Sequence, residues 1–180
     1  TAEQLDALLH GQLHAGFVHA SAVPPQLESL PLEDDEFVLC LPEDHPRAHQ
    51  AEADLRELAS ESFVMFSREV SPANYDNVIA IFSRIGIHPR TVHAARQWLT
   101  IVAMVAHGLV ISLVPRSIAR SRVVGVRFVR FSADSVRSPA LLVCNPGNPL
   151  PLLPLFFHIA SATRHTPPPP PPSPRPRPPP

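Results

Sequence analysis

The sequence predicts an α/β fold, because segments typical of strands alternate with segments typical of helices along most of its 180 residues. The predicted strands are continuous apolar runs, such as 63–66 and 110–114, without the alternation of a half-exposed strand. Continuous runs are typical of parallel sheets that are covered on both faces. No apolar run approaches the ~20 residues that cross a bilayer, so we expect no membrane span.

The first predicted helix begins at Thr1, which can cap it, with Gln4 three residues later in a capping-box arrangement. Leucines at helical spacing follow, and Gly11 ends the helix. Residues 13–18 are expected to form a buried strand. After a polar bend a second strand ends at Pro42. Up to residue 66 we also expect a short helix at 54–58 and a strand at 63–66.

The second long helix opens at Ser71-Pro72, a cap followed by proline in the first helical position, and ends near Ile85. A third helix covers 97–107, with Gly108 in the stop position. The other expected elements are strands at 90–94, 110–114, 126–131 and 141–144, a short helix at 117–120, and an apolar-faced helix at 152–163.

Prolines are concentrated at the carboxyl end of the chain. Eleven of the 24 lie between positions 167 and 180, so residues 1–166 have an ordinary globular composition. We expect 166–180 to be a proline-rich disordered tail that forms an exposed polyproline II rod. This tail is either a PxxP-type ligand or spacer, or an extension without a role in the domain.

Charge is also divided along the chain. Residues 1–76 have a net charge of −12 and residues 77–180 a net charge of +11, and all 15 basic residues are arginine. No dense basic patch with interleaved aromatic residues occurs in the sequence. This chain therefore has no nucleic-acid footprint of its own.

The two cysteines, Cys40 and Cys144, are too few for a disulfide scaffold. Both fall in apolar strands, where a free cysteine usually packs as a small core residue; a redox-sensing pair is the alternative. With no secretory signal at the start, they favour a reducing, cytoplasmic location.

The sequence predicts neither an enzyme nor a cofactor. It contains no Gly-x-Gly-x-x-Gly, Walker, Gly-x-Ser-x-Gly or His-Glu-x-x-His pattern. His10 and His14 are four residues apart, as are His45 and His49, but neither pair has a third ligand nearby in the sequence. We therefore expect no metal site.

Three predicted helices begin with polar or small residues directly after a strand or a loop. These starts are Thr1, Ser71 to Asn74, and Arg96 to Trp98. In a parallel α/β sheet such starts lie at the carboxyl ends of the strands, where ligands bind. Because a helix start offers unpaired N–H groups and partial positive charge, converging starts favour an anion. They predict a pocket for a small carboxylate with Trp98 as an aromatic wall; the alternatives are ordinary capping, and core packing of Trp98.

The order of these pieces resembles the effector-binding domain of LysR-type transcriptional regulators. The resemblance rests on residues 1–17, 32–46, 72–89 and 102–115, and it covers about 1–164. A helix, a glycine, a strand and a proline in succession, together with a strand ending in Leu-Pro-x-x-His-Pro, are distinctive in combination. Two departures suggest a divergent member: the family commonly has Asp at the position of His14 and Gly at the position of Val110.

The resemblance implies two Rossmann-like lobes of the periplasmic-binding-protein (type 2) kind, hinged by two crossing strands. On that pattern lobe one is 1–42 plus 139–165, and lobe two is 43–138. The family's winged helix-turn-helix, its linker helix and the first strand–helix pair of lobe one do not occur in the chain. The first lobe is therefore expected to be incomplete, and DNA would be bound only through the absent winged helix-turn-helix domain.

The spacing is most similar to the branch of the family that responds to aromatic acids and their ring-cleavage products. The resemblance implies a small-molecule carboxylate effector, a homodimer or homotetramer, and no catalytic residues. The second hypothesis is a stand-alone periplasmic-type solute-binding protein for a small carboxylate, and the third is an enzyme with the same fold. The branch often has Arg at the position of His19, near the effector pocket. With His19 and the Ser71 cap included, the residues that the resemblance implies in effector binding are Thr1, His19, Ser71, Pro72, Asn74, Gln97 and Trp98.

Overall fold

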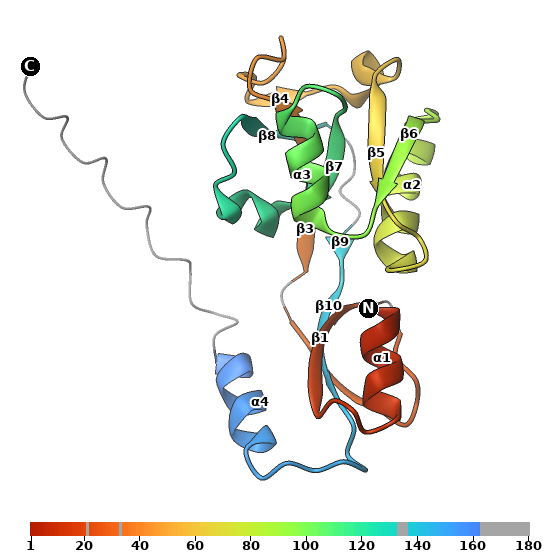
Figure 1. Cartoon of the computed structure of the whole chain (residues 1–180), viewed down its shortest axis with the longest axis vertical. Coiled ribbons are helices and arrows are strands. Elements are labelled where there is room, and N and C mark those ends of the chain that lie inside the picture. The colour runs from red at the N-terminus through yellow and green to blue at the C-terminus, as the bar shows by residue number, and fades with distance from the viewer. Residues whose placement is uncertain (21, 33, 133–136, 163–180) are drawn as a thin grey trace, which may run out of the picture.

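The chain folds into two groups of elements, joined by strands that run between them (Figure 1). The computed structural model describes residues 1–20, 22–32, 34–132 and 137–162, so the tail expected at 166–180 lies outside it. The helices are α1 (Ala2–Leu9), η1 (Leu55–Leu58), α2 (Pro72–Arg84), α3 (Trp98–Ala106), η2 (Arg116–Ser121) and α4 (Leu153–Ala162), of which η1 and η2 are 3-10 helices. The strands are β1 (Ala15–His19), β2 (Glu28–Pro31), β3 (Asp35–Pro42), β4 (Glu52–Ala53), β5 (Ser62–Phe66), β6 (Arg90–Ala95), β7 (Ser112–Pro115), β8 (Val126–Phe131), β9 (Arg137–Ser138) and β10 (Ala140–Cys144).

The first group is a three-stranded sheet with one helix against it. β10 is the central strand, antiparallel to β1 on one side and to β2 on the other. α1 packs against this sheet, with Leu8, Val18 and Val143 buried in their shared core. Gly11 ends α1 as expected: its φ of 70° allows the tight turn that leads into β1.

The second group is built around β3. This strand is antiparallel to β7 on one side and to β8 on the other, and β8 also pairs in parallel with β4. β5 and β6 form a parallel pair, which joins β7 through the parallel bridge between Phe63 and Ile111. The β5–β6 pair is thus a two-stranded sheet of its own, which this bridge links to the larger sheet of β4, β8, β3 and β7.

The expectation of parallel strands is wrong for part of the fold. The β5–β6 and β4–β8 pairs are parallel, whereas every described pair that β3 or β10 makes is antiparallel. β3 leads the chain into the second group and β10 leads it back. Each of these two strands is therefore antiparallel to the strands beside it: β3 to β7 and β8, and β10 to β1 and β2.

Burial on both faces, rather than strand direction, explains the apolar run of β3. Leu39 and Leu41 pack into a core cluster with residues of α2, while Val38 and Cys40 pack into another with residues of α3. Alternate side chains of a strand point to opposite faces, so a strand between two helical layers is apolar at every position.

The chain passes between the two groups through paired segments. Asp35 and Glu36 of β3 pair with Ser138 and Arg137 of β9, and β3 lies in the second sheet from residue 37 onward. We therefore propose that the first lobe ends near residue 34 rather than at 42. Its returning segment begins near 139, as expected.

α4 contacts the first group through an aromatic pair. The rings of Phe17 and Phe156 lie edge to face with their centroids 6.0 Å apart. No residue of α4 is buried, although its sequence is almost wholly apolar. None of the helices in the described residues is long and apolar enough to span a membrane.

Candidate functional site

The candidate site lies at the edge of the second sheet that faces α1 (Figure 1). β5 and β6 are parallel, so their carboxyl ends lie at the same edge, followed by the loops that lead into α2 and α3. The N–H of Ser67 donates to the carbonyl oxygen of Ala95 at 2.8 Å, which holds these two loops together. Ser67 in turn accepts from the N–H of Ser71 at 3.2 Å.

The start of α1 completes the edge from the first group. The backbone nitrogens of Thr1 and Ala2 lie 3.3 and 3.4 Å from the carbonyl oxygen of Val70. Glu3, in the first turn of α1, forms an ion pair with Arg96, whose Nη2 lies 2.9 Å from Glu3 Oε1. The three helix starts predicted from the sequence are thus brought together across the two groups.

None of the three N-cap side chains bonds to its own helix. The capping box expected of Thr1 and Gln4 is wrong, because the Thr1 hydroxyl instead accepts a hydrogen bond of 3.4 Å from the backbone N–H of His19. This contact ties α1 to the end of β1. The helix starts therefore keep N–H groups that their own caps do not satisfy.

The start of α2 holds the buried polar groups of the site. Ser71 and Asn74 are each only 2% exposed, and the described structure has no hydrogen-bond partner for the Ser71 hydroxyl. A buried hydroxyl without a partner costs free energy, because it has lost its hydration without replacement. Such an orphan group at a helix start is a position where a ligand oxygen would be stabilised.

The other predicted residues differ in their surroundings. His19 is half-buried, whereas Pro72 and Gln97 are exposed. The Trp98 ring lies 4.4 Å from that of Phe66, tilted by 36°, and packs against both core clusters. Most of the contacts described for Trp98 are therefore core packing. The sequence left this interpretation open as the alternative to an aromatic wall of the pocket.

Two ion pairs at the site were not foreseen from the sequence. Arg96 belongs to a predicted helix start, but nothing in the sequence links it to Glu3, 93 positions earlier. Arg68 pairs with Asp76 through two contacts of 3.0 and 3.4 Å near the start of α2. The only signal for either pair was the concentration of acids in the first part of the chain.

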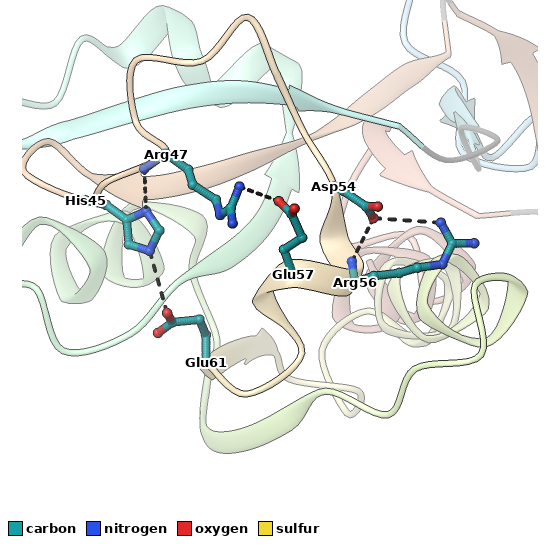
Figure 2. A network of polar contacts seen from close by, with 6 residues as sticks. All are labelled: His45, Arg47, Asp54, Arg56, Glu57 and Glu61. Atoms are coloured by element: carbon teal, nitrogen blue, oxygen red, sulfur yellow. Dashed lines mark hydrogen bonds and ion pairs between the residues drawn. The ribbon is translucent and has the colours of Figure 1, made fainter.

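A separate polar network joins the loop after β3 to η1 (Figure 2). His45 Nδ1 accepts from the backbone N–H of Arg47 at 3.1 Å, and its Nε2 lies 3.7 Å from Glu61. Arg47 also pairs with Glu57. His45, a candidate metal ligand in the sequence together with His49, thus belongs to a hydrogen-bonded network. The described residues contain no group of three His, Cys, Asp or Glu placed to hold a metal ion.

The two cysteines are buried in different sheets. Burial raises the pKa of Cys40 to about 12, and it also raises that of Cys144, next to Glu28. Their thiols consequently stay protonated at neutral pH, which makes them poor nucleophiles. The structure favours the core-packing interpretation over a redox-sensing pair.

Comparison with known proteins decides the family. The model of the LysR substrate binding domain matches residues 1–162. The chain belongs to this family. Among its relatives, the uncharacterized HTH-type transcriptional regulator YnfL of Escherichia coli K12 is 30% identical over 143 residues, which are 79% of this chain and 48% of YnfL. The chain spans about half the length of the curated relatives that it matches.

Solved structures of the family share the fold. Full-length CbnR in complex with its target DNA superposes with a TM-score of 0.79 at 24% identity, covering 92% of this chain and 58% of CbnR. The BenM effector-binding domain with its effector benzoate superposes with a TM-score of 0.71 at 21% identity, covering 94% of this chain and 79% of that domain. The two-lobed, periplasmic-binding-protein-like α/β fold expected from the sequence is therefore confirmed. The relatives are transcriptional regulators rather than enzymes.

Proposed function

We propose that this chain is the ligand-sensing domain of a LysR-type transcriptional regulator and binds a small carboxylic acid between its two lobes. The observation that carries the proposal is the buried, unpartnered hydroxyl of Ser71, placed where three helix starts meet. Family membership supports the regulatory role, and the benzoate bound by BenM supports an acid as the effector.

The chemistry of the edge fits a carboxylate. Helix starts present N–H donors and the positive ends of helix dipoles, both of which stabilise an anion. The Ser71 hydroxyl and the Asn74 amide lie at the start of α2, and the exposed Gln97 lies at the start of α3. In this proposal Thr1 and His19 border the effector from the first lobe. Pro72 and the partly exposed Trp98 border it from the second lobe.

The effector acts by shifting the relative positions of the two lobes. A ligand that contacts both lobes stabilises the arrangement of the lobes in which both contacts form. The difference in ligand-binding free energy between the two arrangements couples the site to other parts of the protein. In the whole regulator the change would pass to a winged helix-turn-helix domain outside this chain, within a homodimer or homotetramer in the cytoplasm. The complex of full-length CbnR with its target DNA supports the DNA-binding part of this proposal.

The two other hypotheses are less well supported. The curated relatives are helix-turn-helix regulators, which favours a regulator over a stand-alone solute-binding protein. The relatives are regulators and not enzymes, so we propose that this domain is not an enzyme either. A helix-turn-helix encoded upstream in the same gene would support the regulator, and a secretory signal there would contradict it.

Calorimetric titration with benzoate, shikimate and cis,cis-muconate tests the proposal. Measurements use the chain itself and, if its gene encodes residues before Thr1, a version extended by those residues. We expect at least one acid to bind, and Ser71→Ala to weaken it about tenfold, the effect of losing one hydrogen bond to a charged group. Ser83→Ala, an exposed serine on the same helix, is the matched control and leaves the affinity unchanged. Failure of every acid to bind either version would overturn the proposal.

A further inference from the structure

The ion pair between Glu3 and Arg96 is the electrostatic contact that joins the two groups at the site. Glu3 lies in the first turn of α1, and Arg96 immediately precedes Gln97, the N-cap of α3. The other ion pairs of the described residues each lie within one group. Among these ion pairs of the described residues, the one made by Arg96 thus connects the two lobes.

Backbone hydrogen bonds link the loop that carries Arg96 to the loop that carries the orphan hydroxyl of Ser71. Ala95, the residue before Arg96, accepts from the N–H of Ser67, and Ser67 accepts from the N–H of Ser71. Arg96 and Ser71 therefore flank one hydrogen-bonded loop pair at the same sheet edge. A planar guanidinium binds a carboxylate through parallel N–H donors, which makes Arg the preferred partner for that group.

Its present partner is weakly held. The side chains of Arg96 and Glu3 are 63% and 81% exposed, and a solvated ion pair of this kind contributes little to stability. The other cation near the start of α2, Arg68, makes two contacts to Asp76, a residue of the same lobe. The Arg68 pair is similarly exposed, so what distinguishes Arg96 is that its carboxylate partner belongs to the other lobe and is held by a single contact, which makes the exchange cost little.

We infer that Arg96 binds the carboxylate of the effector, and that the Glu3 carboxylate occupies its place in the ligand-free form. Binding exchanges one carboxylate for another on the same guanidinium. The exchange releases the start of α1 from the loop between β6 and α3, so the arrival of the effector is coupled to a contact between the lobes. This inference rests on the proposed function and assigns to it a specific cation and a built-in competitor.

The competition predicts opposite effects for the two partners. Glu3→Gln removes the internal competitor, so we expect benzoate, or whichever acid of the panel binds tightest, to bind about three- to fivefold more tightly. Arg96→Gln removes the cation, so we expect affinity to fall about tenfold or more. The neutral amide of the same acid, benzamide for benzoate, should gain nothing from Glu3→Gln.

Two matched variants control for general charge effects. Asp6→Asn removes an acid from the same helix, and Arg90→Gln removes an exposed arginine from β6; both should leave affinity within about twofold, as expected for distant solvated charges. Circular dichroism and the melting temperature of each variant show that it is folded.

The outcomes separate this inference from the proposed function. Weaker binding by Glu3→Gln would show that the ion pair closes the lobes over the ligand, and would overturn the competition. Unchanged binding by Arg96→Gln, with binding still weakened by Ser71→Ala, would overturn the role of Arg96 alone. If no acid of the panel binds the unmodified protein, the proposed function and this inference fall together.

Discussion

The hydroxyl of Ser112 donates a hydrogen bond of 2.8 Å to the carbonyl oxygen of Val64, between two strands that share only one bridge. Ser112 lies in β7 and is 1% exposed, while Val64 is fully buried in β5. The backbone adds a bond of 3.0 Å from the N–H of Val64 to the carbonyl oxygen of Ile111. The β5–β6 pair that carries the candidate site is therefore attached to the rest of the sheet partly by a side chain.

Ser112→Ala should destabilise the domain by about 1–2 kcal/mol, because it leaves the Val64 carbonyl buried with one acceptor bond fewer. Urea unfolding followed by circular dichroism measures the change in the free energy of unfolding. Ser117→Ala, at an exposed position that follows the same strand, should change it by less than about 0.5 kcal/mol. Equal effects of the two substitutions would show that the Ser112 hydroxyl contributes nothing to the junction.

Asn145, the residue that follows β10, fixes the end of α1. Its Nδ2 donates to the carbonyl oxygen of Leu8 at 2.8 Å, and Asn148 Nδ2 donates to that of Gly11 at 2.9 Å. Asn145→Ala should cost about 1 kcal/mol, because its bond is partly buried, whereas Asn148→Ala should cost less because its bond is exposed. The order of the two unfolding midpoints in urea checks this, and the reverse order would contradict it.

Arg122 holds a backbone conformation that suits glycine. At φ 50° and ψ 39° it ends η2 in the left-handed region, where a side chain is strained. Arg122→Gly should therefore raise the free energy of unfolding by about 0.5–1 kcal/mol. Arg120→Gly, inside η2, should lower it by a similar amount. Differential scanning calorimetry would show the two melting temperatures moving in opposite directions, and a decrease for both would refute the strain.

Cys40 should make the domain less stable in alkali. Its pKa is about 12 in the folded protein and 9.0 when unperturbed, so the unfolded chain releases this proton first as the pH rises. The stabilising effect of the raised pKa is complete below pH 9 and is lost between about pH 9 and 12, with a slope of roughly 1 kcal/mol per pH unit. Unfolding experiments across this range should give a shallower slope for Cys40→Ala. An identical slope would show that the buried thiol is not the group responsible.

The sequence predicts where most elements begin and end, because their signals are local. Pro72 starts α2, and Gly11 and Gly108 adopt the positive φ that follows a helix end. The direction of β3 escaped prediction, because a run of apolar residues reports burial and not which strands lie beside it. The cap at Thr1 failed for a similar reason: its hydroxyl bonds to His19, a tertiary contact that no local motif encodes.

For the candidate site too, the sequence predicts the local features and not the tertiary contacts. The residues at the three helix starts can be found from the sequence, since each start has its own polar signature. What the residues meet there cannot be found in this way. The orphan state of the Ser71 hydroxyl depends on tertiary packing, and the pairing of Glu3 with Arg96 depends on how one lobe is placed against the other.

The pairing of Asp35 with Ser138 has a further consequence for how the protein can be rebuilt. The chain enters the second lobe and leaves it through neighbouring positions, so the whole lobe is an uninterrupted insert whose two ends lie side by side. Ends in this arrangement are where natural and engineered domain insertions succeed. The second lobe can accordingly be exchanged with that of another family member through two cuts, leaving the first lobe and its partners intact.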